Sequence, residues 1–142
     1  MNVQDVMNHE AETISPSTTL KDAAGIMAEE HIGFLLIGEN DKLKGTLTDR
    51  DLVVRAVAKG QNLGNTTVDD ILTGDLLYCR ADQDVTEVAR NMSDKKVRRM
   101  PVVDEDKRLV GVVSIGDLAQ HLDKNEVGNI LKGVTSEGQH AA

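Results

Sequence analysis

Apolar residues along this chain form a series of helical and strand-like patterns, and the series occurs twice. Leu20, Ala23 and Met27 recur at the spacing of one helix face, which predicts an amphipathic helix over Leu20–Glu30. Phe34–Ile37 is a continuous apolar run of strand length, which is typical of a strand buried on both faces. Each half therefore reads as a short helix, a strand, a helix, two strands and a final helix.

The other predicted helices and longer strands complete this order. They are Val3–Met7, Leu43–Thr48, Asp49–Ala58, Val85–Lys95, Met100–Val103, Leu109–Ser114, Ile115–Leu122 and, beyond the second half, Glu126–Lys132. We expect Gly60 and Gly133 to end the helices before them, because glycine readily adopts the left-handed conformation found at helix C-termini.

The two halves also share sequence. Val3-Gln-Asp-Val-Met7 reappears as Val68-Asp-Asp-Ile-Leu72, and Gly45–Leu52 reappears as Gly111–Leu118. The first pair is offset by 65 residues and the second by 66, so a single one-residue insertion or deletion relates the halves. A repeat this long, present only twice, favours a duplicated module that closes on itself over an open solenoid.

The predicted fold class is α/β, of the α+β kind, with tandem β-α-β-β-α motifs. We expect two small sheets packed about a pseudo-two-fold axis, with the helices outside. The expected organisation is residues 1–60 for the first repeat, 61–67 for a linker, 68–124 for the second repeat, and 125–142 for a C-terminal helix and tail.

Composition narrows the class of protein. The net charge of −8 disfavours nucleic-acid binding, and Phe34 and Tyr78 are the only aromatic residues available to stack on bases. The single cysteine, Cys79, excludes an internal disulfide and fits a reducing compartment. No apolar run approaches the ~20 residues of a membrane span, and the N-terminus lacks a signal-peptide pattern. We therefore expect a cytoplasmic protein with no membrane partner.

One motif is the best candidate for a site. Both copies read glycine, two residues, threonine or serine, two residues and aspartate, at a predicted strand-to-helix junction. Thr48 and Ser114 are good N-caps, and Asp51 and Asp117 follow at the third helical position, as in a capping box. The same helix N–H groups, hydroxyl and carboxylate also make a compact polar site able to accept the hydroxyls of a ribose. The two interpretations are not exclusive.

The remaining candidates have simpler interpretations. The basic segment Lys95–Arg99 is either a helix end with dipole-favoured cations or a phosphate-binding element. The four histidines lack metal-ligand spacing, and no nucleophile, general base or P-loop is readable, so we predict no metal site, no catalytic residue and no enzyme. Cys79 is interpreted as a small buried hydrophobe.

The doubled pattern resembles the CBS domain pair, or Bateman module, from about Val3 to Leu122. The supporting motifs are Asp5-Val-Met7, Asp70-Ile-Leu72, Thr13-Ile-Ser-Pro16, Val97-Arg-Arg-Met-Pro-Val-Val-Asp104 and both Gly…Thr/Ser…Asp segments. The segment Thr48–Gly60 is most similar to small stand-alone bacterial members, including the hypoxic-response type from mycobacteria.

This resemblance implies a regulatory module that needs no cofactor and binds AMP, ADP, ATP or a related adenosyl ligand in the cleft between its repeats. Asp51 and Asp117 would each hold a ribose, helped by Thr48 and Ser114. Strands of the other repeat would cover the base, with Ile14, Gly33, Phe34 and Leu35 serving the Asp117 site and Cys79, Met100 and Pro101 serving the Asp51 site. The phosphate would contact Arg98, Arg99, Arg50 or Lys96.

The first half lacks the arginine and proline that the family favours, because it has Ile32-Gly33-Phe34-Leu35-Leu36 where the second half has Val97-Arg-Arg-Met-Pro101. We therefore expect at most one tight nucleotide site. Two functions remain open: a nucleotide sensor that reports to an unidentified protein target, or a ligand-free structural or stress-response dimerisation scaffold. The family implies a flat homodimer, and the apolar side of the helix at Leu52, Val53, Ala56 and Val57 motivates it.

Overall fold

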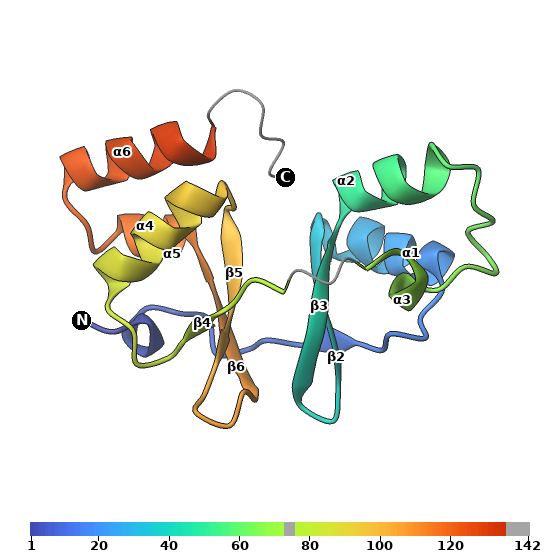
Figure 1. Cartoon of the computed structure of the whole chain (residues 1–142), viewed down its shortest axis with the longest axis horizontal. Helices are drawn as coiled ribbons and strands as arrows, with labels where there is room; N and C mark the ends of the chain where they lie inside the picture. The colour runs from blue at the N-terminus through green and yellow to red at the C-terminus, as the bar shows by residue number, and fades with distance from the viewer. Residues whose placement is uncertain (73–75, 136–142) are drawn as a thin grey trace. The chain divides into compact units, whose positions relative to one another are not determined.

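The computed structural model describes residues 1–72 and 76–135, and the chain divides into two compact units (Figure 1). One unit contains Glu12–Leu76, and the other combines Met1–Ala11 with the described chain from Leu77 onward. We name them the Asp51 unit and the Asp117 unit. Their edges differ from those of the sequence repeats, because the helical turn that opens each repeat packs with the sheet of the other repeat.

The Asp51 unit is a three-stranded sheet with helices. Its elements are β1 (Thr13–Ile14), α1 (Leu20–Glu30), β2 (Phe34–Glu39), β3 (Lys42–Thr48), α2 (Asp49–Asp51), η2 (Leu52–Val57) and α3 (Val68–Ile71). The strand order is β1-β2-β3, with β1 parallel and β3 antiparallel to β2. Asn40 and Asp41 have positive φ angles of 54° and 64°, which suit the tight hairpin turn between β2 and β3.

The Asp117 unit repeats this plan and adds a helix. Its elements are η1 (Val3–Asp5), β4 (Cys79–Arg80), α4 (Val85–Lys95), β5 (Arg99–Val103), β6 (Leu109–Ser114), α5 (Ile115–Ala119) and α6 (Lys124–Val134). The strand order is β4-β5-β6, again with one parallel and one antiparallel pair. The two three-stranded sheets with helices confirm the predicted α+β fold class.

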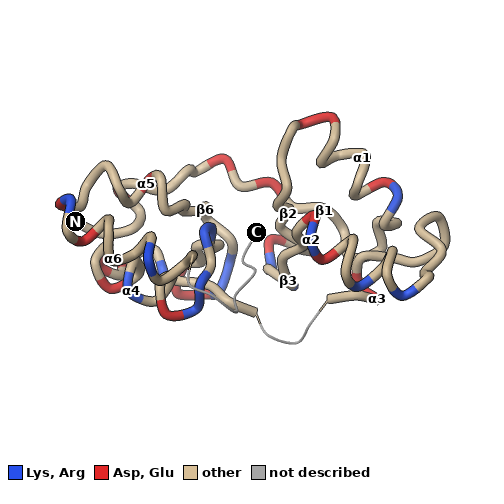
Figure 2. Tube along the Cα trace, turned by 90° about the horizontal axis from the view of Figure 1, so that it is seen from above, with Lys and Arg blue, Asp and Glu red and all other residues tan. Residues whose placement is uncertain are grey.

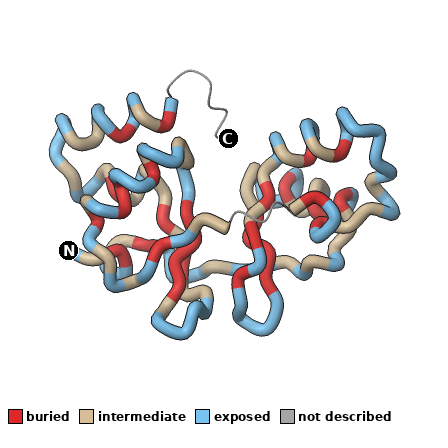
Figure 3. Tube along the Cα trace, in the orientation of Figure 1, coloured by how far each residue is buried: buried red, intermediate tan, exposed pale blue. Residues whose placement is uncertain are grey.

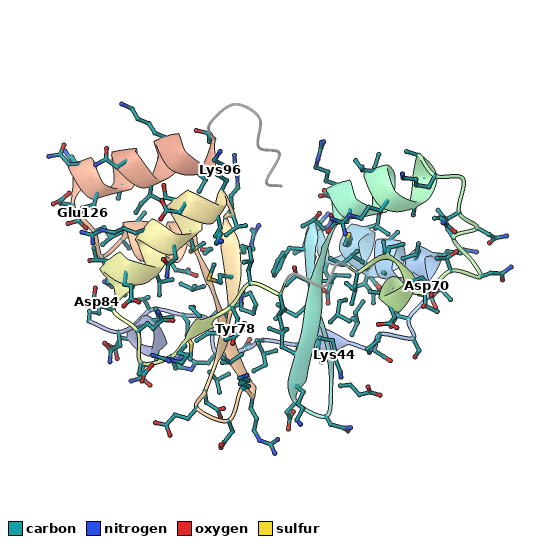
Figure 4. All side chains as sticks on the ribbon, in the orientation of Figure 1. Lys44, Asp70, Tyr78, Asp84, Lys96 and Glu126 are labelled. Atoms are coloured by element: carbon teal, nitrogen blue, oxygen red, sulfur yellow. The ribbon has the colours of Figure 1, made fainter. Side chains whose placement is uncertain are left out.

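The two long helices of the repeats begin and end in the same way. The Thr19 Oγ1 accepts the Asp22 N–H at 3.2 Å, and the Asp84 Oδ1 accepts the Thr86 N–H at 2.8 Å. This second hydrogen bond lowers the pKa of Asp84 below its ordinary value. His31 and Lys96 end α1 and α4 in the left-handed conformation (Figure 4 labels Asp84 and Lys96 at the two ends of α4).

Each unit has its own aliphatic core (Figure 3). In the Asp51 unit, Leu20, Ile37 and Leu47 are almost completely buried between α1 and the sheet. In the Asp117 unit, the most deeply buried side chains include Met92 and Leu118. Burial of this apolar surface is the main favourable term in the folding of each unit.

The opening turn of each repeat packs against the motif glycine of the opposite repeat. A Cβ on Gly111 would lie 2.6 Å from the Met7 sulfur and 2.8 Å from the Asn8 carbonyl oxygen. A Cβ on Gly45 would lie 3.1 Å from the Leu72 Cδ1. These glycines are therefore required for close packing, which is one of the two roles that the motif allowed.

Four predicted helices differ from the structure, and the first of them, Val3–Met7, is a 3₁₀ helix that ends at Asp5. Residues Asp49–Ala58 were predicted as one α-helix, but Leu52–Val57 is π-helical, and the Ala58 N–H donates to the Val53 carbonyl five residues earlier at 2.9 Å. Helix α5 ends at Ala119 rather than Leu122, because Asp123 adopts an extended conformation to cap α6. The π-helical turn has no signature in apolar spacing alone, so the sequence did not reveal it.

Helix α6 is longer than predicted and runs through Gly133, which therefore does not end it. The Asp123 Oδ1 accepts the Glu126 N–H at 2.7 Å and begins the helix at Lys124. Helix α6 packs along α4 (Figure 1), where a Cβ on Gly133 would come within 2.9 Å of the Ser93 Cβ. Glycine at this position permits the close approach of two helices. The predicted tail from Ser136 lies outside the described residues.

Candidate functional site: two strand-to-helix junctions

The two motif aspartates form matching capping boxes. The Thr48 N–H donates to the Asp51 Oδ2 at 2.9 Å, and the Asp51 N–H donates to the Thr48 Oγ1 at 3.1 Å. In the other unit, the Ser114 N–H and the Asp117 Oδ2 are 2.9 Å apart, and the Asp117 N–H and the Ser114 Oγ are 3.1 Å apart. The capping role is therefore confirmed, and each box uses only one of the two carboxylate oxygens of its aspartate.

The start of the central strand lies beside each capping box. Phe34 pairs with Thr48 across β2 and β3, and the Asp49 N–H donates to the Gly33 carbonyl at 3.0 Å. In the same register Arg99 pairs with Ser114, and the Ile115 N–H donates to the Arg98 carbonyl at 3.0 Å. Gly33 and Phe34 in one unit therefore occupy the places of Arg98 and Arg99 in the other.

The structure thus divides the predicted site residues into two groups, one in each unit. Thr48, Arg50 and Asp51 lie with Ile14, Gly33, Phe34 and Leu35, whereas Ser114 and Asp117 lie with Cys79, Arg98, Arg99, Met100 and Pro101. It stays a prediction that strands of the other repeat cover the base of a ligand held by each aspartate.

The apolar members of these sets contribute mainly to the cores. Leu35 is 6% exposed, Cys79 is 2% exposed and Met100 is 3% exposed, and each belongs to the core cluster of its own unit. Burial raises the pKa of the Cys79 thiol to about 12, so the sulfur is unreactive at neutral pH. This agrees with its interpretation as a small hydrophobe. Ile14 and Phe34 are only partly buried and keep some surface for contact with a ligand.

The charges around the two capping boxes differ. In the Asp51 unit, the Asp49 carboxylate approaches Gly33, since a Cβ there would lie 2.7 Å from its Oδ2. In the Asp117 unit, the equivalent positions carry Ile115 and the exposed Arg98 (Figure 2 colours cations blue and anions red). At the start of the central strand, an anionic ligand group would therefore meet the Asp49 carboxylate in the Asp51 unit and guanidinium groups in the Asp117 unit.

The second carboxylate oxygen also differs between the two aspartates. The Asp51 Oδ1 lies 3.7 Å from the Arg55 Nε, four residues later in the chain. The residue four positions after Asp117 is His121, and no hydrogen bond or ion pair to the Asp117 Oδ1 occurs within residues 1–72 and 76–135. The Asp117 carboxylate therefore keeps an oxygen for a ligand hydroxyl.

Among the described residues, no group of three or more histidine, cysteine, aspartate or glutamate side chains is arranged to hold a metal ion. In the same part of the chain, no helix has the length and apolar character needed to cross a membrane.

The protein-family model of the CBS domain matches residues 3–57 and 68–124. The chain belongs to the CBS-domain family. These two matches account for most of the chain, with one match in each half of the repeat. CBS-domain relatives are regulatory modules. The names of two stand-alone relatives, CBS domain-containing protein YhcV and Hypoxic response protein 1, denote no enzyme.

Two stand-alone CBS proteins match over nearly their whole length. The CBS domain-containing protein YhcV of Bacillus subtilis is 33% identical over 140 residues, which are 98% of this chain and 99% of that protein. Hypoxic response protein 1 of Mycobacterium tuberculosis is 35% identical over 134 residues, which are 94% of this chain and 93% of that protein. The predicted resemblance to the hypoxic-response type is confirmed.

Two solved structures are similar to the fold. The crystal structure of Hypoxic Response Protein I with two coordinated zinc ions has a TM-score of 0.77 and 36% identity, and the match covers 87% of this chain and 100% of that one. The crystal structure of CBSX2 in complex with AMP has a TM-score of 0.73 and 27% identity, and the match covers 84% of this chain and 94% of that one. One CBS relative of this size therefore binds an adenine nucleotide.

Sequence reasoning missed two residues at the junctions. Asp49 was not predicted as a site residue, yet its carboxylate lies beside Gly33, where the other unit has Arg98. Arg55 was not singled out, although an arginine four residues after an aspartate on a helix is a recognised ion-pair spacing. That spacing was the signal available in the sequence.

Proposed function

We propose that the protein is a non-catalytic sensor that binds an adenine nucleotide at the Ser114–Asp117 junction and reports it to a protein partner. The observation that carries this proposal is the register pairing of Arg99 with Ser114, which places a cation suited to phosphate next to a capped carboxylate within one unit. The AMP complex of CBSX2 supports the choice of an adenosyl ligand. We expect the protein to act in the cytoplasm.

Each group at this junction has a role suited to its chemistry. The Asp117 Oδ2 is held by the Ser114 N–H, so the other oxygen is oriented to accept a ribose hydroxyl. Arg98 and Arg99 offer forked N–H donors that match phosphate oxygens better than the single ammonium of a lysine does. From the family resemblance, we expect strands of the other repeat to cover the adenine.

Calorimetric titration tests the proposal. AMP, ADP, ATP, NADH and S-adenosylmethionine are titrated into the wild-type chain and into Asp117→Ala. We expect one tight binding event with at least one of them, and a loss of roughly tenfold or more in affinity in the variant, because hydrogen bonds to a charged acceptor are lost.

Asp51→Ala is the matched control, since it removes the equivalent capping carboxylate from the other unit. It should reduce stability by at least as much as Asp117→Ala, because it also removes the ion pair with Arg55, while leaving the tight binding event intact. Equal affinity in the wild type and Asp117→Ala would show that the wrong junction has been chosen. An absence of heat from all five compounds would favour the scaffold alternative.

We also propose that the protein forms a homodimer through the exposed side of η2. The exposed valines of this helix favour a dimerisation scaffold as the second candidate function. Val53, Val54 and Val57 are 57%, 43% and 58% exposed, whereas Leu52 and Ala56 on the same helix are buried. Three neighbouring exposed valines on one short helix are unusual for a surface that faces only water.

Sedimentation equilibrium at micromolar concentration tests this interface. We expect a dimer for the wild type and a monomer for Val53→Asp combined with Val57→Asp, because two charges would be buried without partners. Lys59→Asp, an exposed site near the end of the same helical segment, is the control and should remain dimeric. A wild-type monomer would contradict the proposal.

A further inference from the structure

Arg55 connects two parts of the Asp51 unit. Its Nε lies 3.7 Å from the Asp51 Oδ1, and its Nη1 donates to the Ile71 carbonyl oxygen at 3.2 Å. Ile71 is the last residue of α3, where helix carbonyls lack partners within the helix. One guanidinium group therefore holds both the motif aspartate and the C-terminal end of a neighbouring helix.

This arrangement leaves Asp51 with both carboxylate oxygens engaged. The Oδ2 accepts the Thr48 N–H at 2.9 Å, and the Oδ1 faces Arg55. The pair is only partly exposed, with 29% of the aspartate side chain and 40% of the arginine side chain accessible. A sugar hydroxyl that approached the Oδ1 would compete with Arg55 for this oxygen.

The arginine is held from a second direction, so its displacement breaks a hydrogen bond as well as an ion pair. An arginine bound only to Asp51 could rotate into water. The hydrogen bond to Ile71 keeps the guanidinium beside the carboxylate, so less side-chain entropy is lost when the ion pair forms. The π-helical segment Leu52–Val57 carries Arg55 at this position, and π-helical turns are frequent at functional sites.

We propose that Arg55 is an intramolecular latch that closes the Asp51 junction to adenosyl ligands and so directs binding to the Asp117 junction. The inference rests on the proposed function, because it assumes that the capped aspartates are the ribose acceptors. The Asp117 junction lacks the latch, since His121 stands where Arg55 does in the repeat. The latch makes Arg55 a specificity-determining residue that competes with the ligand rather than binding it.

Two reciprocal variants test the latch. Arg55→Gln removes the cation from the Asp51 junction, and His121→Arg places one at the same spacing from Asp117. The probes are adenosine, AMP and ATP, and calorimetry measures the binding of each one. We expect Arg55→Gln to add a second binding event, clearest with adenosine because Asp49 opposes phosphate there. We expect His121→Arg to weaken the first event by about two- to fivefold, the range set by one partly exposed ion pair.

Combining each variant with an aspartate substitution identifies the site that changes. The new event in Arg55→Gln should disappear on adding Asp51→Ala and persist on adding Asp117→Ala. Arg55→Lys, which keeps the charge but loses the forked donors, is the variant to use if Arg55→Gln does not fold, and it should show a weaker form of the same gain. A ligand-free check is the double-mutant cycle of Asp51→Asn and Arg55→Gln in urea unfolding, which should show favourable coupling.

The outcomes separate the two proposals. Two equal binding events in the wild type, or one event that Arg55→Gln leaves unchanged, would overturn the latch while retaining the sensor. Loss of the wild-type event in Arg55→Gln would show that Arg55 contacts the ligand, which also overturns the latch. Absence of binding by every probe in both the wild type and the variants would overturn the sensor, and the latch with it.

Discussion

The Asp51 and Asp117 junctions share their backbone geometry and differ in their charges. Both have a hydroxyl N-cap, an aspartate at the third helical position and the same register between the central and last strands. Beside Asp51 the chain places Gly33, Asp49 and Arg55, whereas the equivalent positions of the other repeat carry Arg98, Ile115 and His121. The capping box is therefore a structural requirement of the repeat, and the neighbouring side chains determine whether a junction suits an anionic ligand.

This difference also explains why the motif alone is a weak indicator of binding. The hydrogen-bond lengths of the two capping boxes agree to within 0.1 Å, so the motif caps its helix equally well in both units. After duplication, one junction can lose its ligand without losing its fold, because capping needs only one oxygen of each carboxylate. Neighbouring charge is the more informative signal.

The largest expected effect is on phosphate binding at the Asp117 junction. Arg98→Ala combined with Arg99→Ala should weaken ATP binding by roughly tenfold to a hundredfold, because charge-assisted hydrogen bonds to phosphate are removed. Adenosine, which has no phosphate, should bind equally well before and after the change. Isothermal titration at two salt concentrations measures both effects, and an equal loss for adenosine would mean that the arginines support the fold rather than the phosphate.

The paired glycines test whether the two units tolerate the same substitution. Gly111→Ala should lower the free energy of unfolding by about 1–3 kcal/mol, because its Cβ would press on a backbone carbonyl as well as on the Met7 sulfur. Gly45→Ala should lower it by less than about 1 kcal/mol, since the nearest atoms belong to the flexible end of Leu72. Urea unfolding followed by circular dichroism compares them, and equal losses would contradict the packing argument.

Cys79 makes the Asp117 unit sensitive to alkali. Burial raises the pKa of this thiol from 9.0 to about 12, so above pH 9 the unfolded chain releases a proton that the folded unit retains. The stability contributed by the neutral thiol is complete below pH 9 and is lost as pH rises towards 12, by up to about 1.4 kcal/mol per pH unit. Ile14 at the equivalent position of the Asp51 unit does not titrate.

Urea unfolding at pH 8, 9 and 10 measures this slope. Cys79→Ala is the control, because tyrosine and lysine residues titrate in the same range and contribute to both proteins. The variant should have lower stability at pH 8 from the smaller side chain, and a shallower decrease above pH 9. Identical slopes would show that the thiol is accessible to water in the folded protein.

Much of the architecture was predictable because local rules determine it. Helices Leu20–Glu30 and Val85–Lys95 occur at the predicted residues, since apolar spacing and N-cap residues act within a few positions in the chain. The capping boxes of Thr48 and Ser114 follow from the same local chemistry. The π-helical turn at Leu52–Val57 and the continuation of α6 through Gly133 were not predictable, because they depend on contacts with distant residues.

The sequence by itself determined the duplication, the order of helices and strands, the aliphatic cores and the presence of two equivalent aspartates. Only the tertiary structure decided which side chains surround each aspartate. The Asp49 carboxylate reaches Gly33, and Arg55 reaches Ile71, through approaches of residues 16 positions apart in the chain. Secondary structure follows from short-range periodicity, but the electrostatic environment of a carboxylate depends on which strands pair and which helix ends meet, and these are properties of the packed chain.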